Sequence, residues 1–276
     1  MIVVSVLFWN LAENAAILPH VGCLGRTHSV DIFLFAESPD DLGPALAGLN
    51  RLRRGIYREA GIGRPKVRML TRLTHPDLDY LFTTIGRETS VWSIRAPKMT
   101  PPEVLLAVTH LPSKAGGHTD EGQAKDAGDV AAELAAFEDR RNHRNTVFVG
   151  DFNMNPYDAG MTLVTGVHGL MTAQLAREKD RLYRRRRYRR FYNPMWGLFG
   201  DRTPGPAGTH FWRSSLPHNT HWAMLDQVLV RPALIDKLAS LAILDNDGKH
   251  SLLAVDGAPH KNHLSDHLPI LFTLDV

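Results

Sequence analysis

The sequence of 276 residues is poor in cysteine, in net charge and in long apolar runs. Its one cysteine, Cys23, excludes an intramolecular disulfide framework and a cysteine-rich metal site. The formal net charge is only +3, which permits a polyanionic partner without requiring one. No run reaches the ~18–20 apolar residues that a membrane-spanning helix needs. Residues 2–9 are apolar but lack the basic segment and cleavage site of a signal peptide, so we expect a strand there and a cytoplasmic protein.

The remaining composition is that of an ordinary globular protein, with 43% hydrophobic and 22% charged residues. The sequence contains no short-period repeat and no Gly/Ser linker, which favours one domain over residues 1–276. One stretch differs in composition, because residues 177–222 are rich in Arg, aromatic residues, Pro and Gly. Long connections inside compact domains tend to be functional or disordered, and this variable segment is expected to be one or the other.

Apolar runs of strand length recur along the chain. Residues 2–9 and 30–36 have the β-branched and aromatic content of strands buried on both faces. Short runs between residues 66 and 108, separated by Pro, Asp and Gly, predict an antiparallel meander. Further strands are expected at 146–149, 224–230 and 268–274, and helices at 13–27, at 44–59 and from Asp120, its expected N-cap, onwards. This order predicts an α/β fold, a four-layer α/β/β/α sandwich of two packed, mostly antiparallel sheets with outer helices.

Polar side chains follow directly after several of these apolar runs. Such positions place a carboxylate, an amide or an imidazole on the rigid edge of a sheet, where loops gather around a cleft. Taken singly, an Asp or Asn there is also typical of a turn, and a lone histidine of a structural residue. Together they supply the ligands of a hard cation and two imidazoles, which favours one common site. The set is Asn10, Glu37, His110, Asp151, Asn153, Asp226, Asp266 and His267.

The motifs that contain these residues resemble those of the endonuclease/exonuclease/phosphatase superfamily. That superfamily includes pancreatic deoxyribonuclease, apurinic endonucleases, deadenylases, neutral sphingomyelinases and inositol polyphosphate phosphatases. The motifs occur in the order of the superfamily and extend over essentially the whole chain. They are WN at 9–10, the Glu of FAES at 37, THLPSK at 109–114, GDFN at 150–153, LDQVLV at 225–230 and SDHLPI at 265–270. The resemblance, to a bacterial-type cytoplasmic member, implies a metal-dependent phosphoric ester hydrolase.

Cleavage of a phosphodiester by in-line attack builds negative charge on the phosphate oxygens and on the leaving oxygen. Mg²⁺ or Mn²⁺ stabilises that charge and is usually bound by one or two carboxylates and water. By resemblance, Glu37 is the first choice for a direct metal ligand, with Asn10 and Asp266 as further ligands, direct or through water. Asp151 then activates or positions the attacking water, and Asn153 binds a phosphate oxygen.

The resemblance gives the two histidines of the set separate roles. His267 either accepts the proton of the attacking water or donates to the phosphate, and Asp226 bonds its other ring nitrogen. His110 lies where deoxyribonuclease-like and sphingomyelinase-like members carry a histidine that contacts the phosphate or protonates the leaving oxygen. Apurinic endonucleases have a tyrosine there, and an acidic residue at the place of Ala12, so the chain departs from that branch.

The variable segment carries a run of arginines, RRRRYRR from residue 184 to residue 190, followed by aromatic residues. Such runs contact phosphate backbones and stack on bases, and they are equally typical of a solvated surface. In the superfamily this segment borders the active-site cleft, so the resemblance implies that it faces the substrate. The expected substrate-binding residues are Arg184, Arg185, Arg186, Arg187, Tyr192 and Trp196.

Three classes of function stay open at this point. The first is a Mg²⁺-dependent nuclease that cleaves DNA or RNA, with nucleic acid as its partner. The second is a phosphatase or phosphodiesterase acting on a phospholipid, an inositol phosphate or a nucleotide, for which residues 194–199 (PMWGLF) are the best membrane-contacting loop. The third, a non-catalytic binding module, is disfavoured because no residue of the catalytic set is missing. The oligomeric state stays open.

The other histidines and the cysteine belong to no motif. Cys23 has apolar neighbours and is expected to pack rather than to react. His250 has no partner that the sequence identifies. Four further histidines match no zinc-binding spacing and are expected to be exposed loop residues, namely His218, His221, His260 and His263.

Overall fold

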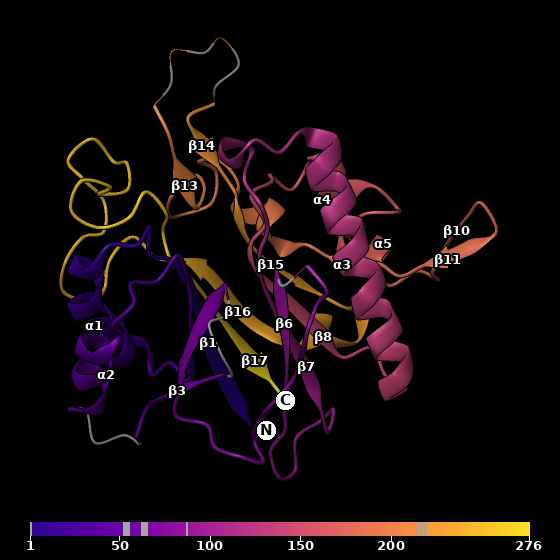
Figure 1. Ribbon diagram of the computed structural model, residues 1–276, viewed down its shortest axis with the longest axis horizontal. Coiled ribbons are helices and arrows are strands. Elements are labelled where there is room, and N and C mark those ends of the chain that lie inside the picture. Colours follow the sequence, from indigo (N-terminus) through magenta and orange to yellow (C-terminus); the bar gives the residue numbers. More distant parts are fainter. Residues whose placement is uncertain are drawn as a thin grey trace.

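The computed structural model describes residues 2–51, 56–61, 66–86, 88–213, 215, 217 and 220–276. Two large mixed sheets form the centre of the described structure (Figure 1). The first sheet has the strand order β16-β17-β1-β2-β4-β3, with β1 (Val3–Asn10), β2 (Ile32–Ala36), β3 (Arg58–Ala60), β4 (Val67–Thr71), β16 (Leu238–Ile243) and β17 (Ile270–Asp275). The second has the order β5-β6-β7-β8-β15-β12-β9, with β5 (Leu78–Thr83), β6 (Thr89–Ile94), β7 (Val104–His110), β8 (Thr146–Asp151), β9 (Gly169–Leu170), β12 (Phe191–Tyr192) and β15 (Asp226–Val230).

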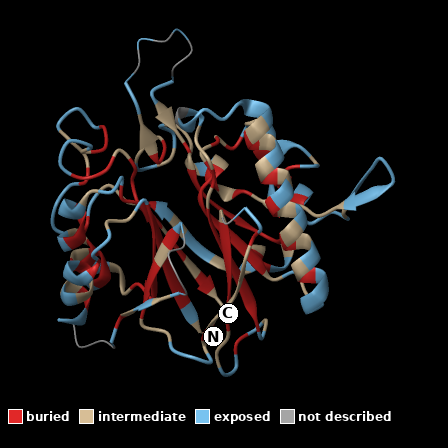
Figure 2. Cartoon of the chain, viewed as in Figure 1, coloured by how far each residue is buried: buried red, intermediate tan, exposed pale blue. Residues whose placement is uncertain are grey.

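Helices cover the outer face of each sheet. α1 (Leu18–His28) and α2 (Gly43–Asn50) lie on the side of the first sheet, and α3 (Asp120–Arg141) and α4 (Ala159–Thr162) on the side of the second (Figure 1). The sheets are buried along most of their length, whereas α3 is buried only on one side (Figure 2). The predicted four-layer α/β/β/α sandwich is therefore confirmed.

The strands bring the motif residues to one end of both sheets. β1 is parallel to β2, and β7 is parallel to β8, so Asn10, Glu37, His110 and Asp151 lie at or just after C-terminal strand ends. β15 and β17 are antiparallel to β8 and β1, so they begin at this same end. The chain termini lie at the opposite end (Figure 1). Side chains from six separate parts of the sequence therefore meet at one edge.

The helix expected at residues 44–59 is shorter than the sequence predicts. α2 ends at Asn50, whose Oδ1 accepts from Tyr57 N at 2.7 Å and whose Nδ2 donates to Tyr57 O at 3.0 Å. These two bonds return the chain toward the sheet, and Arg58–Ala60 forms the strand β3 instead of a helix. Residues 52–55 of that prediction lie outside the described residues.

α3 begins one residue earlier than expected. Its N-cap is Thr119, not Asp120, because the Thr119 side chain accepts from the Gly122 amide. Asp120 is the first helical residue, where its charge interacts favourably with the helix dipole. Gln123 makes no capping box, since its Nε2 donates to Pro112 O and to Asn153 O, both at 3.0 Å. The buried Gln123 thus fastens two motif loops to each other.

One buried ion-pair network joins α3 to the second sheet. Glu138 is 1% exposed and accepts from Arg231 Nε at 2.8 Å, from Arg189 Nη1 at 2.6 Å and from Thr146 Oγ1 at 2.6 Å. Arg231 is also buried, and its Cζ lies 3.7 Å from the ring centroid of Phe191. The network places two cationic side chains and one carboxylate in the interior, where each depends on the others.

The variable segment 177–222 is structured in its described part. After α5 (Ala173–Ala176) it contains the hairpin of β10 (Arg181–Tyr183) and β11 (Arg186–Tyr188), the strand β12, the 3-10 helix η3 (Pro194–Leu198), and β13 (His210–Phe211), which pairs with β14 (Trp222–Ala223). The alternative of a disordered connection is therefore wrong for these elements. None of the helices in the described ranges is long and apolar enough to cross a membrane.

Candidate active site

The last residue of β1 joins the two sheets. Asn10 is buried, and its Nδ2 donates to Glu37 Oε1 at 3.2 Å and to Asp151 Oδ2 at 2.9 Å. Its Oδ1 accepts from Ala12 N at 3.0 Å. In this orientation Asn10 holds one carboxylate from each sheet beside the other, while its own oxygen is occupied by a backbone amide.

Glu37 follows β2 in a left-handed backbone conformation, with φ 43°. A non-glycine residue adopts that conformation at a cost of about 1–3 kcal/mol, which surrounding contacts must offset. Glu37 Oε1 lies 3.3 Å from His110 Nε2, and this hydrogen bond is the main cause that lowers the pKa of Glu37 below its ordinary value. Its side chain is 40% exposed, so a charged carboxylate faces solvent at the edge of the cluster.

The GDFN motif turns sharply after β8. A Cβ on Gly150 would lie 2.0 Å from Thr109 O, so only glycine fits at this position. Asp151 is 1% exposed, and its Oδ1 accepts from Asn153 N at 2.8 Å. Asn153 has φ 51°, a conformation that asparagine tolerates well, and its Nδ2 donates to Leu111 O at 2.8 Å. The motif therefore fixes the orientation of a buried carboxylate.

His267 and Asp226 form a buried pair. His267 Nδ1 lies 2.8 Å from Asp226 Oδ2, and Asp226 N is bonded to Thr209 Oγ1 at 3.0 Å. Burial opposes the charged form of His267, but the carboxylates of Asp226, Asp151 and Asp266 outweigh it and raise the pKa of His267 to about 10. These carboxylates therefore favour the charged form of the ring. Because Asp226 holds Nδ1, Nε2 is the nitrogen left for other partners.

The loop that carries His267 is fastened to β1. Ser265 Oγ donates to Asn10 O at 2.8 Å and accepts from His267 N at 3.0 Å. Trp9 Nε1 donates to His267 O at 2.9 Å. These bonds explain why the WN and SDH motifs occur together: each positions the other. They also hold His267 in the interior, where it is 7% exposed.

His210, on β13, is a residue of this site that sequence reasoning missed. Its Nε2 lies 3.7 Å from Asp266 Oδ2, and its ring centroid is 4.6 Å from that of His267. Burial opposes ionisation of Asp266, but the neighbouring imidazoles of His210 and His267 lower the pKa of Asp266 to about 2. No sequence signal singles out His210, because the same Thr-His pair also occurs at residues 27–28, 74–75, 109–110 and 220–221, and only the pair at 109–110 belongs to a motif.

The donor set at this edge fits a divalent cation. Glu37 and Asp266 are 40% and 38% exposed, whereas the other two carboxylates of the cluster are buried. Ligand atoms fall into three compact groups within 4.8 Å, which are Glu37–His110–Asp151, Asp151–Asp226–His267 and His210–Asp266–His267. Oxygen donors with room for water suit a hard cation such as Mg²⁺, so the residues fit the expected metal. Glu37 and Asp266 belong to different groups, which favours a water-mediated role for one of them.

The expected substrate-binding arginines lie apart from this cluster. Arg184–Arg187 form the tip and one strand of the β10–β11 hairpin, which projects from the body of the molecule beyond α3 and α5 (Figure 1). Arg184 and Arg185 make the turn with φ 45° and 65°. All four arginines are exposed, and no contact joins them to the catalytic set in the described part of the chain.

The expected aromatic residues are closer to the body of the molecule. Tyr192 is half-buried in β12, where it pairs with Val230. Trp196 in η3 has its ring centroid 6.4 Å from that of Tyr157, four residues after Asn153. Of the other histidines, His221 and His263 are exposed and His260 is half-buried, while His218 lies outside the described residues.

Comparison with known proteins identifies the fold. The sequence matches no family model and no curated protein. The structure is similar to an AP endonuclease from Archaeoglobus fulgidus (13% identity, 99% of this chain and 100% of that chain, TM-score 0.60). It is also similar to an endonuclease/exonuclease/phosphatase family protein from Bacteroides thetaiotaomicron (15%, 99% and 95%, TM-score 0.59) and to D. rerio TDP2 complexed with a single-strand DNA product (13%, 99% and 99%, TM-score 0.55).

Because the sequence identities are only 13–15%, the similarity to these structures defines the fold alone. The chain has the fold of the endonuclease/exonuclease/phosphatase proteins, over essentially its whole length. The superfamily resemblance predicted from six short motifs is confirmed at this level. The motif residues meet where the fold places its two sheet ends side by side, as described above.

Proposed function

We propose that the chain is a Mg²⁺-dependent phosphodiester hydrolase and that its substrate is DNA or RNA. The main support is a single observation. Asn10, Glu37 and Asp151 come from two different sheets and meet the His267–Asp226 pair at one edge. The fold supports it, because the similar structures include an AP endonuclease and a TDP2 with a bound single-strand DNA product.

Glu37 and Asp266 are the residues that would hold the metal ion, since theirs are the carboxylates of the cluster that face solvent. Asn10 would act as a positioning residue and would contact the ion through water, because its Oδ1 already accepts from Ala12 N. When bound, Mg²⁺ supplies stabilisation of the negative charge that develops on the phosphate. Imidazolium and amide donors of the protein supply the remaining stabilisation of that negative charge.

The protein groups divide the proton transfers between them. The raised pKa of His267 favours its role as a donor to a phosphate oxygen through Nε2, rather than as the general base. Asp151 is buried and oriented by Asn10 and Asn153, and it accepts the proton of the attacking water. His110, 3.9 Å from Asp151 through its Nε2, donates to the leaving oxygen or the phosphate.

The shape of the variable segment favours nucleic acid over a lipid. Residues 194–199 present no exposed apolar loop, because Met195 is fully buried and Leu198 and Phe199 pack against the core. The β10–β11 hairpin is a two-stranded ribbon of the kind that enters a nucleic-acid groove. Its register pairs Arg181 with Tyr188 and Tyr183 with Arg186, so one face carries both basic and aromatic side chains.

Removal of divalent metal is expected to abolish hydrolysis without unfolding the protein. The measurement is turnover of single-stranded DNA, double-stranded DNA, RNA, inositol phosphates and sphingomyelin with Mg²⁺, with Mn²⁺ and with excess EDTA. Nucleic-acid cleavage should disappear in EDTA and return with added Mg²⁺, because the buried carboxylates alone cannot stabilise the developing charge. Circular dichroism in EDTA is the control for folding. Activity that survives EDTA would refute the metal mechanism.

Neutralising Arg184–Arg187 with glutamine is expected to weaken nucleic-acid binding and to flatten its salt dependence. Each lost phosphate contact should reduce the slope of log K against log salt by about 0.7–0.9. Cleavage of a short dinucleotide substrate should be unaffected, since the hairpin lies apart from the catalytic set.

The matched control neutralises four exposed basic residues outside the variable segment, which are Arg26, Arg51, Lys98 and Arg140. If the hairpin variant and this control lose equal binding affinity, the loss is due to net charge and not to the position of the hairpin. An unchanged affinity and slope in the hairpin variant would favour a small phosphorylated substrate instead.

A further inference from the structure

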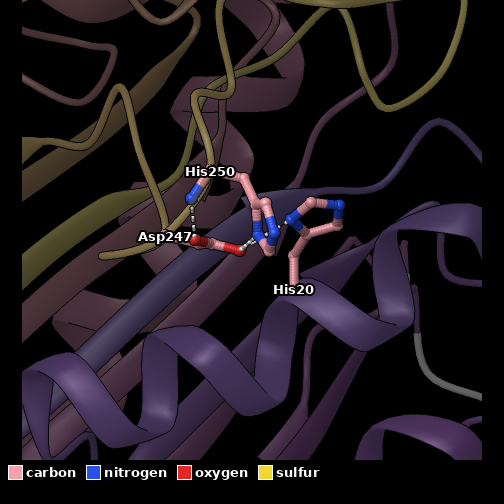
Figure 3. A group of neighbouring side chains, drawn as sticks. All are labelled: His20, Asp247 and His250. Carbon is pink, nitrogen blue, oxygen red and sulfur yellow. Dashed lines mark hydrogen bonds and ion pairs between the residues drawn. The ribbon is translucent and has the colours of Figure 1, made fainter.

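A second cluster of metal-ligating side chains lies outside the catalytic set, on the side of the molecule that α1 covers. His20 is near the start of α1, whereas Asp247 and His250 belong to the connection between β16 and β17. Asp247 Oδ2 lies 2.7 Å from His20 Nδ1 and 3.2 Å from His250 Nδ1 (Figure 3). The three ligand atoms all lie within 4.8 Å of one another. His250 therefore has partners, although the sequence identifies none.

The backbone around Asp247 holds its carboxylate in place. Asp247 is fully buried, and its Oδ1 accepts from Lys249 N at 2.8 Å and from His250 N at 2.7 Å. Its carbonyl oxygen accepts from Thr27 Oγ1 at 3.1 Å. Next to it, Gly248 has φ 89° and approaches Thr27 so closely that a Cβ would lie 2.0 Å from Thr27 Oγ1. The loop is thus fitted against α1, and Oδ2 is left for the two imidazoles.

The spacing of the three ligand atoms suits a tetrahedral ion. Ligands that bind zinc at ~2.0–2.1 Å are roughly 3.3 Å apart in tetrahedral geometry. Asp247 Oδ2 lies 2.7 Å from His20 Nδ1 and 3.2 Å from His250 Nδ1, so an ion requires the His20 contact to lengthen by about 0.6 Å, while the two nitrogens already lie within 4.8 Å of each other. Two imidazoles and one carboxylate make a nitrogen-rich donor set, and imidazole suits Zn²⁺ rather than Mg²⁺.

The alternative is a hydrogen-bonded cluster without a metal ion. Two neutral imidazoles would then donate their Nδ1–H groups to the same carboxylate oxygen, and no ion would be needed. The geometry distinguishes this cluster from ordinary loop histidines in one respect. The nearby His260 and His263 have rings 4.6 Å apart, but they belong to none of the metal-ligating groups found among the described residues.

We propose that His20, Asp247 and His250 form a zinc site that ties α1 to the connection between β16 and β17. The buried carboxylate supplies the negative charge, the two imidazoles supply nitrogen ligands, and the partial exposure of both rings leaves a fourth position for water. The site is structural in its consequence, because it links residues that are 227 positions apart in the chain. It is independent of the proposed hydrolase activity.

The test is zinc binding by the whole chain in excess Mg²⁺, with His250→Gln as the variant. The wild type should bind one more equivalent of zinc than the variant after a chelator wash, measured by elemental analysis. Loss of a direct ligand should lower the affinity by more than the ~10–100-fold that loss of an outer hydrogen-bond partner costs. Cobalt in place of zinc should give the visible absorption of a tetrahedral site only in the wild type. Zinc should raise the thermal midpoint of the wild type alone.

His263→Gln is the matched control, since it removes an exposed histidine from the same loop region and should bind zinc as the wild type does. His250 is 52% exposed, so its variant is expected to fold. If circular dichroism shows that it does not, His20→Gln replaces it with the same expectation. Equal zinc content and affinity in the wild type and the variant would overturn the site. So would a wild type that binds no zinc, or an equal loss in the His263→Gln control.

Discussion

Replacing His267 with asparagine is expected to slow phosphodiester hydrolysis by roughly 1000-fold, within the range that a positioned proton donor contributes. Asparagine keeps an N–H group near the place of Nδ1, so the bond to Asp226 Oδ2 has a substitute. It cannot reproduce the imidazolium or reach a phosphate oxygen with Nε2. The loss should appear in kcat under single-turnover conditions, with little change in substrate affinity. Asparagine is preferred to alanine because His267 is buried, and a truncation would also leave Asp226 unpaired.

The matched control for this experiment is His168→Asn. His168 is equally a buried histidine, its Nδ1 lies 3.0 Å from Arg189 O, and its φ of 57° is one that asparagine adopts readily. It lies outside the catalytic set, so this variant should retain nearly full activity. Activity of His267→Asn within about tenfold of the wild type would refute the role given to His267. A similar loss in both variants would assign the effect to folding.

Replacing Glu138 with glutamine is expected to lower the free energy of unfolding by about 3–5 kcal/mol. The substitution keeps the shape of the side chain but leaves Arg231 buried without its carboxylate. Urea unfolding followed by circular dichroism measures the change. Glu133→Gln is the control on the same helix, because Glu133 is only partly buried and accepts weak bonds from Ile85 N at 3.2 and 3.4 Å. A loss below about 1 kcal/mol would contradict the buried-pair explanation.

Two further measurements separate charge from packing in this network. The double variant Glu138→Leu with Arg231→Met should recover more than half of the lost stability, because a buried pair replaced by apolar residues is often neutral. Arg189 still has Ala135 O as a partner in that variant. Burial opposes ionisation of Glu138, but Arg231, Thr146 and Arg189 lower its pKa below 4.5. The stabilisation is therefore present above about pH 5 and is lost as pH falls through the lowered pKa.

Much of the fold could be predicted because its central strands have local signals. β1 and β2 are buried along almost their whole length, so they occur as unbroken apolar runs with a polar residue at the end. The end of each run could be read directly, and it placed Asn10 and Glu37 at a strand end. The end of α2 could not be predicted in this way, because it depends on the two hydrogen bonds between Asn50 and Tyr57 rather than on helix propensity.

The proposed catalytic set could be predicted from its motifs, whereas the residues that support it could not. His210 contacts Asp266 only because β13 lies beside the loop before β17. The Thr-His dipeptide does not predict that pairing. Gln123 lies three residues after Asp120, which is the spacing of a capping box. In the structure its side chain instead donates to Pro112 O and Asn153 O, which are distant in sequence. The direction in which the arginine-rich hairpin projects follows from its place in the chain between α5 and the strand β12.

Asp151, Asn153, Asp266 and His267 show where the two sources of information divide. The sequence by itself determined their residue types and their positions at the ends of buried strands, because both depend on neighbours along the chain. The tertiary structure alone decided that Asp151 lies opposite Asp226, that Asn10 bridges two sheets and that neighbouring carboxylates raise the pKa of His267. Those properties depend on the register between distant strands and on burial among distant charges, which exist only once the two sheets have packed together.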